Sequence, residues 1–391
     1  ALQGLADRFG LDGHRLDEVI AGAVTTHPKD FNLAREALLS TSLSPLTPGI
    51  TLQQACGTSL QGALMIGAKI ASGQIECGIA AGTDTTSDPP ISFSRKFAQR
   101  LVKANAARSA KQRLRTFKGF RPSELKPLLP ANSEPRTGLS MGAHCERMAR
   151  EWKIAREAQD QLAMESHLKA NQAYNDGFFD PLVTPWGGAA RDNNIRADSN
   201  LDKLGSLRTV FEKGSDASLT AGNSTTLTDG AAAVLLASEE WAEAHGLPVQ
   251  AYLTAGRTSA VDFVNDEGLL MAPTVAVAEM LQRTGLTLQD FDFYEIHEAF
   301  AAQVLCTLAA WESEDYCRGR LGLEQALGSI DRARMNVKGS SVAVGHPFAA
   351  TGARMVLCTA LELMKRDRQF ALITLCAAGA MGAAVVLETA P

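Results

Sequence analysis

Two cysteines and two histidines in this 391-residue sequence have surroundings suited to thiol chemistry: Cys56, His297, His346 and Cys376. Cys56 lies in QQACGTS, between an apolar segment at residues 50–54 and a run that becomes apolar at helical spacing from Leu60. A thiol at such a strand-to-helix junction faces free amides and the positive end of the helix dipole, so the sequence predicts a lowered pKa for Cys56. The alternative is that Cys56 is simply a small core residue, as free cysteines often are.

A thiolate nucleophile needs a base, and two histidines lie at suitable junctions. His297 ends the strand-like FDFYEI and opens a helix-like segment, and His346 lies in AVGHPF ahead of a helical pattern at residues 352–365. Cys376 follows the apolar FALITL and precedes AAGAMG, a small-residue turn that leaves room for a substrate beside the sulfur. Each residue taken singly also fits a structural role.

The elements that must position these residues follow an α/β rhythm. It runs through residues 14–87 and 206–391, whereas residues 88–205 are more polar and basic, which predicts an insertion into, or a lid over, an α/β framework. The order of apolar strand, tight turn and small-residue helix occurs around Cys56 and again around His346, which indicates a duplicated core. The apolar stretch at residues 371–387 is broken by two glycines and predicts two buried strands rather than a membrane span.

Composition narrows the class of protein. The net charge of -5 gives no reason to expect a nucleic-acid partner. The 7 cysteines are scattered without a CxxC pair, so neither a metal site nor a disulfide framework is expected, and we predict a reducing, cytoplasmic compartment. No secretory signal is visible in the sequence.

A basic stretch interrupts this ordinary composition. Residues 95–126 hold eleven Lys or Arg residues and one acid, Glu124. Phe93, Phe97 and Leu101 fall at helical spacing within or beside it. The stretch fits a solvated face, a surface that steers a ligand carrying several phosphates, or a segment that contacts a partner or a membrane.

Six segments together resemble the thiolase family, in the family's order. They are QQACGTS, RTGLSMG, TAGNSTTLTDGAAAVLL, HEAFAAQ, GHPFAATGAR and CAAGAMGAA. The resemblance covers essentially the whole chain, and the HEAF form is similar to that of the trifunctional-enzyme β-subunit branch.

The resemblance implies a thiolase-like α/β fold. Two duplicated βαβαβαββ halves would form a layered α/β/α/β/α core with an inserted loop domain. The expected division is residues 1–102 and 206–238 for the N-terminal half, 103–205 for the loop domain and 239–391 for the C-terminal half. Family members begin with a strand ahead of the first helix, whereas this sequence starts at that helix, so an initial strand is expected to be missing.

The resemblance also implies roles for the residues already named. Cys56 would take the acyl group, His346 would accept its proton, and Cys376 would act as general acid and base on the second substrate. One oxyanion hole would be formed by His346 and a water held by His297, and the other by the backbone N–H groups of Cys56 and Ala378. The residues expected to contact coenzyme A or substrate are Met141, Ser224, Thr225 and Phe300.

The implied activity is the cleavage of 3-ketoacyl-CoA by CoA in fatty-acid β-oxidation. The alternatives are acetoacetyl-CoA synthesis and a ketoacyl-synthase-like condensing enzyme, which would lack a catalytic Cys376. Coenzyme A would be a substrate, with no tightly bound cofactor. The implied partners are a second copy of the chain, as a homodimer or dimer of dimers, and a β-oxidation α-subunit. Two departures from the family pattern are His297, where many members have Asn, and Ala378, where many have Gly.

Overall fold

The computed structural model describes residues 1–265, 267–366 and 369–389, and its core contains two four-stranded sheets. The first has the order β2-β1-β3-β4, and the second has the order β5-β8-β7-β6. In the first sheet β1 runs parallel to β2 and β3, and β3 pairs antiparallel with β4. In the second, β7 runs parallel to β6, and β8 pairs antiparallel with β7 and β5. The strands are β1 (Glu18–Gly22), β2 (Gly49–Thr51), β3 (Cys77–Asp84), β4 (Gly230–Ala237), β5 (Tyr252–Ala260), β6 (Phe293–Ile296), β7 (Phe370–Ala377) and β8 (Met381–Glu388).

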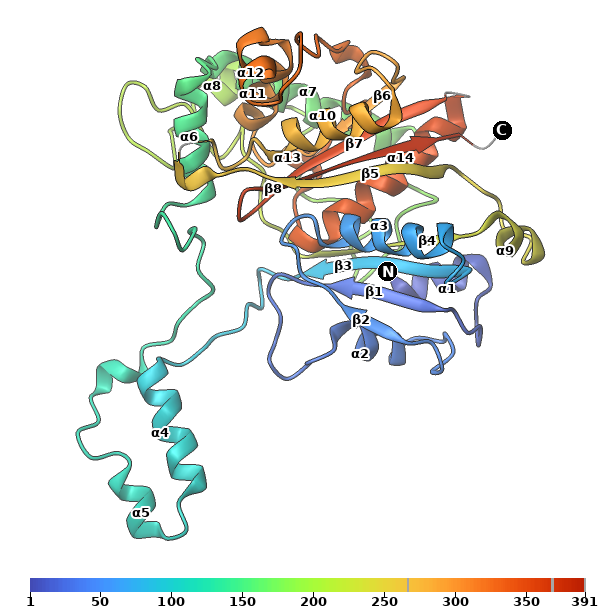
Figure 1. The fold of residues 1–391 in the computed structure, drawn as a ribbon. Helices are drawn as coiled ribbons and strands as arrows, with labels where there is room; N and C mark the ends of the chain where they lie inside the picture. Colours follow the sequence, from blue (N-terminus) through green and yellow to red (C-terminus); the bar gives the residue numbers. More distant parts are fainter. Residues whose placement is uncertain (266, 367–368, 390–391) are drawn as a thin grey trace.

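Two helices lie between the sheets (Figure 1). They are α3 (Thr58–Ala71) and α14 (Thr351–Arg366), and both pack their apolar faces into one buried cluster with strands of both sheets. A Cβ built on Gly352 would lie 2.6 Å from the backbone nitrogen of Leu60, so glycine at this position allows α14 to approach α3 closely. This contact holds the two halves together at the level of the site.

Other helices cover the outer faces of the sheets. A buried cluster joins α1 (Leu2–Phe9) and α2 (Leu33–Leu39) to the first sheet, and another joins α10 (Ala272–Thr284) and α11 (Ala301–Glu312) to the second. The predicted α/β/α/β/α arrangement of two similar halves is therefore confirmed. The two strands predicted within residues 371–387 are β7 and β8. Short helices complete the chain: α9 (Glu239–Ala244), α12 (Glu314–Gly319), α13 (Ser341–Val344), η2 (Phe263–Asn265), η3 (Arg332–Arg334) and η4 (Phe348–Ala350).

One expected strand is absent from the described part of the chain. The repeat of strand, turn and helix predicted a strand just before His346, but residues 341–344 form the helical turn α13. The backbone N–H of Val342 donates to the buried carboxylate of Glu298 at 3.2 Å, which pairs this amide with a side chain instead of a neighbouring strand. Where the missing strand would have paired with β6, the structure has a single parallel bridge between Tyr294 and Met335.

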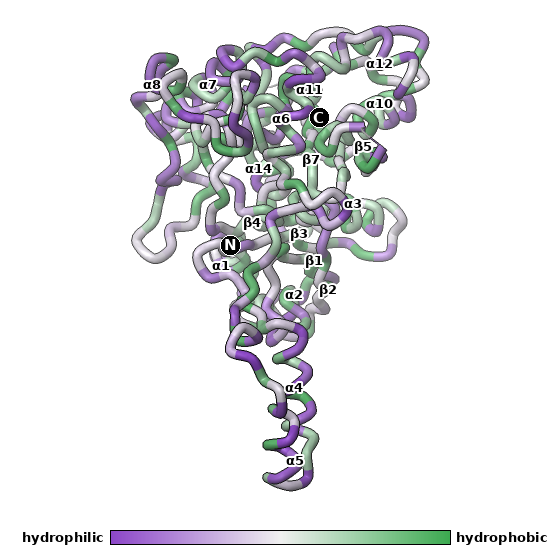
Figure 2. The backbone as a smooth tube through the Cα atoms, turned by 90° about the vertical axis from the view of Figure 1, so that its left-hand side faces the viewer, coloured by the Kyte–Doolittle hydropathy of each residue, from purple (hydrophilic) through white to green (hydrophobic). Residues whose placement is uncertain are grey.

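The insertion consists of two parts with different surroundings. Residues 92–128, here called the arm, are closed at their base by paired backbone hydrogen bonds between Ser92 and Leu128. The arm contains α4 (Arg95–Ala106), α5 (Ala110–Arg115) and η1 (Pro122–Leu125), and it projects from the core (Figures 1 and 2). The following helices α6 (Met141–Glu151), α7 (Arg156–Asn175) and α8 (Leu201–Gly205) lie beside the second half. The predicted boundary at 102/103 falls inside α4.

Candidate active site

Cys56 lies in a strained turn between β2 and α3. Ala55, the residue before it, has φ 48°, a left-handed conformation that costs a residue with a β-carbon free energy. The hydroxyl of Thr58 closes the turn by donating to the carbonyl of Ala55 at 2.7 Å and accepting from the amide of Gln54 at 2.9 Å. Thr58 therefore ties the turn rather than capping α3, whose N-cap is Gly57 without a side-chain hydrogen bond.

His346 from the second half reaches the Cys56 thiol. Its Nε2 lies 3.0 Å from Cys56 Sγ, and its Nδ1 lies 2.7 Å from the hydroxyl of Thr351, the first residue of α14. Gly345 with φ 93° turns the chain just before the ring, and the amide of His346 donates to the carbonyl of Thr226 at 3.1 Å. A cysteine and a histidine at this distance have the geometry of a nucleophile and its base.

The electrostatics of this pair differ from the sequence prediction. Burial raises the pKa of Cys56 to about 12, although the backbone N–H groups of Ala378 and Cys56 itself lower it. Burial and the charge of Arg354 lower the pKa of His346 to about 3. The prediction of a lowered thiol pKa was wrong, because the loss of solvation outweighs the amides. The resting pair is a neutral thiol beside a neutral imidazole.

His297 lies directly after β6, and its ring centroid is 4.3 Å from that of His346. Its Nδ1 is 2.8 Å from the hydroxyl of Ser341, whereas its Nε2 is buried without a hydrogen-bond partner among the described residues. Burial, and then the charges of His346 and Arg354, keep the pKa of His297 well below its usual value. The Cys56 sulfur and ring nitrogens of both histidines lie within 4.8 Å of one another, so the structure brings these three predicted residues into one site.

Cys376 completes the group from the end of β7. Its side chain is fully buried, and burial raises its pKa. Its chain neighbours Leu375 and Ala377 pack in the same buried cluster as Cys56. The turn that follows contains Gly379 with φ 74° and Ala380 with φ 58°, and the amide of Gly379 donates to Glu134 at 2.9 Å. This turn directs the amide of Ala378 towards Cys56.

The residues predicted to contact coenzyme A lie around the same site. Ser224 and Phe300 form a backbone bridge, and the amide of Thr225 donates to the carbonyl of Ala299 at 3.1 Å. Met141, at the start of α6, packs in the cluster that contains Phe300 and Cys376. The buried hydroxyl of Ser224 has no hydrogen-bond partner among the described residues, so it remains able to bind a ligand.

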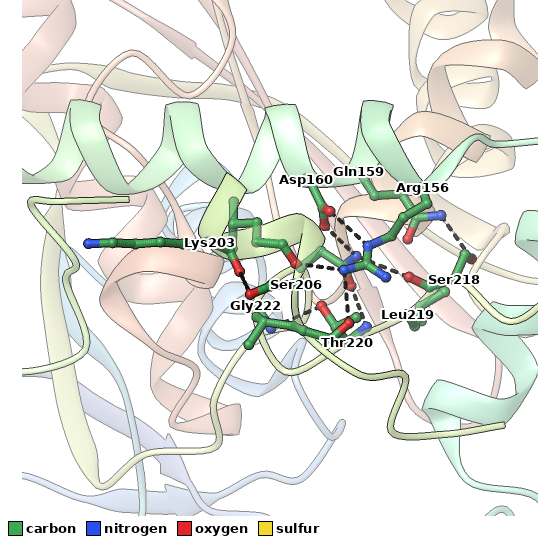
Figure 3. Close-up of polar contacts among 12 residues, drawn as sticks. Arg156, Gln159, Asp160, Lys203, Ser206, Ser218, Leu219, Thr220 and Gly222 are labelled. Atoms are coloured by element: carbon green, nitrogen blue, oxygen red, sulfur yellow. Dashed lines mark hydrogen bonds and ion pairs between the residues drawn. The ribbon is translucent and has the colours of Figure 1, made fainter. Parts of the chain in front are cut away.

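Polar contacts with α7 anchor the loop that carries Ser224 and Thr225 (Figure 3). Asn223 donates to the carboxylate of Asp160 at 2.9 Å, and Gln159 donates to the hydroxyl of Ser218 at 2.9 Å. Asp160 is itself held by Arg156 at 2.7 Å. The inserted helices therefore contribute to the position of the predicted substrate-binding loop.

Sequence reasoning missed a set of buried polar residues behind the two histidines. Arg354 donates to Glu295 at 2.7 Å and to Ser341 at 2.9 Å. Glu298 accepts from Ser166 and Asn336, and burial raises its pKa to about 7. The available signal was charge in apolar surroundings: two glutamates within FYEIHEAF and an arginine within the small-residue segment AATGAR.

Comparisons with known proteins agree with this geometry. The family described as thiolase, N-terminal domain matches residues 1–240, and that described as thiolase, C-terminal domain matches residues 247–389. A 3-ketoacyl-CoA thiolase of Yersinia pestis is 43% identical in an alignment 390 residues long, which covers 98% of this chain and 89% of the relative.

Two solved structures have the same fold. The acetyl-CoA acetyltransferase of Bacillus anthracis has a TM-score of 0.80 at 28% identity, covering 100% of this chain and 91% of that chain. The human mitochondrial 3-ketoacyl-CoA thiolase in complex with CoA has a TM-score of 0.80 at 25% identity, covering 100% and 90%. Matched along both halves and similar in fold throughout, the chain belongs to the thiolase family, whose members are acyltransferases.

Proposed function

We propose that the protein cleaves 3-ketoacyl-CoA with CoA to give acetyl-CoA and a shortened acyl-CoA, through an acyl group carried on Cys56. The observation that carries this proposal is the 3.0 Å contact between Cys56 Sγ and His346 Nε2 in a buried site that also contains Cys376. The similar proteins named 3-ketoacyl-CoA thiolase support the same substrate class.

In the first half of the reaction, His346 takes the proton of the Cys56 thiol as the sulfur attacks the ketone carbon. The oxyanion receives hydrogen bonds from the backbone N–H groups of Cys56 and Ala378. Collapse of this intermediate breaks the bond between carbons 2 and 3 and leaves the electron pair on an acetyl-CoA enolate. The Cys376 thiol protonates carbon 2, which yields acetyl-CoA, acyl-Cys56 and a Cys376 thiolate.

In the second half, the Cys376 thiolate takes the proton of the incoming CoA thiol. The CoA sulfur attacks the acyl group, and the same two amides stabilise the oxyanion. Collapse releases the Cys56 sulfur, which recovers its proton from the imidazolium of His346. His346 and a water held by His297 are the proposed donors to the thioester oxygen of the acetyl-CoA enolate.

The biosynthetic direction is the alternative, and the similar Bacillus anthracis acetyl-CoA acetyltransferase favours it. The deciding experiment compares kcat/KM for thiolysis of short- and long-chain 3-ketoacyl-CoA with the rate of acetoacetyl-CoA formation from acetyl-CoA. We expect thiolysis of longer chains to be preferred. A preference for acetyl-CoA condensation would favour the biosynthetic reading, and no activity with any ketoacyl-CoA would overturn the proposal.

We further propose that the arm contacts an anionic membrane surface. Its segment 95–126 holds eleven basic residues, and Arg100 engages its one acid, Glu124, at 2.7 Å. Figure 1 places α5 at the far end of the arm, away from the strands and helices that hold Cys56, which disfavours steering of coenzyme A by α5. The arm's large exposed apolar side chains include Phe93, Leu101, Val102 and Leu114. Basic charge beside exposed apolar side chains is typical of segments that bind lipid surfaces.

Vesicle sedimentation tests this proposal. Anionic phosphatidylglycerol vesicles should bind the protein in a salt-dependent way, and neutral phosphatidylcholine vesicles should not. Replacing four basic residues of the arm by Gln should abolish binding; they are Arg108, Lys111, Arg113 and Arg115. The control replaces four exposed basic residues outside the arm by Gln, and it should leave binding unchanged; they are Lys29, Lys153, Arg208 and Lys213. A raised KM for CoA in the arm variant, with vesicle binding unchanged, would assign the arm to coenzyme A instead.

Assembly as a homodimer or dimer of dimers, and association with a β-oxidation α-subunit, stay predictions that sedimentation and co-purification would test. All seven cysteines are free, which supports the proposed cytoplasmic location. No helix in the described ranges has the length and apolar character needed to cross a membrane.

A further inference from the structure

His297 presents one ring nitrogen to the active site and the other to the protein. Nδ1 lies 2.8 Å from Ser341 Oγ, and Nε2 has no partner among the described residues. The ring is fully buried and neutral, so only one nitrogen carries a proton. Nε2 with a proton donates a hydrogen bond into the site, whereas bare Nε2 accepts one and acts as a base.

The hydrogen bonds of Ser341 decide between these tautomers. Its Oγ lies 2.9 Å from Arg354 Nη2, and a guanidinium can only donate, so Ser341 accepts in this contact. The hydroxyl has a single proton, and among the residues that the structure describes its one acceptor is Nδ1 of His297. If Nδ1 carried the proton, Ser341 Oγ would accept from both Nδ1–H and Arg354, and the proton of this buried hydroxyl would be left without an acceptor, which is costly.

Arg354 is itself fixed in place. Its Nη1 donates to Glu295 Oε1 at 2.7 Å, and the same carboxylate oxygen accepts from the hydroxyl of Ser340 at 2.8 Å. Ser340 Oγ also accepts from Arg354 Nη2 at 3.3 Å, and within the described ranges no hydrogen bond joins it to His297. A permanently protonated side chain therefore sets the direction of the whole chain of hydrogen bonds, from Arg354 through Ser341 to His297.

We propose that Arg354 and Ser341 are positioning residues that hold His297 in the Nε2–H tautomer, so that its ring donates a hydrogen bond into the site instead of accepting a proton. The proposal rests on the thiolase reaction proposed above and specifies the donor behind one of its oxyanion contacts. It also explains why His can stand where many family members have Asn. Both side chains then present an N–H donor, but only the histidine needs a neighbour to select its tautomer.

A kinetic cycle tests this assignment. Ser341→Ala should lower kcat by about tenfold or more, since a misplaced oxyanion donor is costly in rate. The control is Thr359→Val on α14, which removes a buried hydroxyl that has no hydrogen-bond partner among the described residues and should therefore change kcat little. Alkylation of Cys56 by iodoacetamide should be unchanged in both variants, and their thermal unfolding should be compared to exclude a folding defect.

The decisive step repeats Ser341→Ala in a His297→Asn background. An amide donor has no tautomer to select, so the second substitution should have little further effect on kcat. Equal losses in the two backgrounds would mean that Ser341 acts through the general structure, and the proposal would be overturned.

Nitrogen NMR of protein labelled in its imidazole rings gives a readout independent of activity. The signals of His297 can be assigned because they disappear in His297→Asn. In the wild type they should show a protonated Nε2 and an unprotonated Nδ1, and in Ser341→Ala this protonation pattern should change. A protonated Nδ1 in the wild type would overturn the proposal even if the enzyme is active. If the NMR shows a protonated Nε2 but the enzyme does not catalyse thiolysis, the proposed function would be overturned and the tautomer assignment would stand.

Discussion

The Nε2 atom of His346 lies 3.0 Å from the Sγ atom of Cys56, although 290 positions separate the two residues. Cys56 precedes α3 in the first half, and His346 precedes α14 in the second. The nucleophile and its base therefore meet only when both halves are packed together. The tight α3–α14 contact at Gly352 is thus a condition for catalysis as well as for stability.

Replacing the proposed base tests this contact directly. His346→Ala should lower kcat by about 10²- to 10⁴-fold, the range expected for loss of a general base. Iodoacetamide should also alkylate Cys56 more slowly in the variant, because no group takes up the thiol proton. An unchanged rate of alkylation would mean that another group deprotonates Cys56.

The alkylation of Cys56 should depend on pH in a specific way. Burial raises the thiol pKa to about 12, so the rate in the free enzyme should keep rising above pH 9 without a plateau. Mass spectrometry should find Cys56 labelled ahead of the other six cysteines, because in the described part of the chain only Cys56 has a hydrogen bond with a histidine, and prior acyl-CoA should protect it. Labelling spread evenly over the cysteines, or a plateau near pH 8, would contradict this account.

Substitution of His297 should show whether its ring acts as a hydrogen-bond donor or as a base. His297→Asn keeps an N–H donor and should retain measurable turnover, whereas His297→Ala should lose on the order of 100-fold in kcat, the usual effect of removing one oxyanion donor. Steady-state kinetics on both variants provide the comparison. Equal losses would indicate that the ring itself transfers a proton.

Cys376→Ala should nearly abolish turnover in both directions. The substitution removes the group that protonates carbon 2 and takes the proton from CoA, while the Cys56–His346 contact remains for alkylation by iodoacetamide. Acylation of Cys56 by a simple acyl-CoA should be slowed, because the leaving CoA thiolate also needs a proton. Cleavage of acetoacetyl-CoA at a near wild-type rate would contradict the two-cysteine mechanism and favour a mechanism like that of ketoacyl synthases.

Stability should fall on acidification below pH 6.5. Burial lowers the pKa of His167 to about 4 and that of His346 to about 3, and it lowers that of His297 as well. Unfolded histidines bind protons near pH 6.5 whereas these three do not, so their contribution is full above pH 6.5 and is lost as the pH falls. The loss is on the order of 1 kcal/mol per group for each pH unit below 6.5.

Glu298 acts in the opposite direction over part of this range. Burial raises its pKa to about 7, so its contribution is full at low pH and is lost as the pH rises through 7. Burial also raises the pKa of Glu295 and Asp192 and lowers that of His144, so four histidines oppose three carboxyl groups. The balance should be a net decrease in Tm between pH 6.5 and 4.5, with a shallower decrease in His167→Gln. A Tm that rises on acidification would contradict the prediction.

Local patterns predicted much of this molecule. The glycine-broken apolar run at residues 371–387 predicted two buried strands, and the change from strand-like to helix-like spacing at Cys56 predicted the turn before α3. These predictions succeeded because they depend on residues that are close in sequence. The order of six family segments identified the fold, and the structure gathers Cys56, His297 and His346 from three of these segments in one site.

Features that depend on distant residues were not predictable in the same way. The dipole argument gave the wrong direction for the pKa of Cys56, because burial by both halves outweighs the local amides. The Ser341 hydroxyl that holds His297 lies 44 positions away in sequence. The helical spacing of Phe93, Phe97 and Leu101 indicated a helix beside the basic residues, but not that residues 92–128 would form an arm closed by Ser92 and Leu128.

The similarity of the two halves also bears on how such a site arises. In each half, a central helix follows a turn at the same place in the fold, and one turn carries Cys56 while the other carries His346. A symmetric ancestor made of two identical halves would have held the same residue at both turns, two thiols or two imidazoles facing each other. The nucleophile and base could therefore specialise only after duplication freed the two copies to diverge.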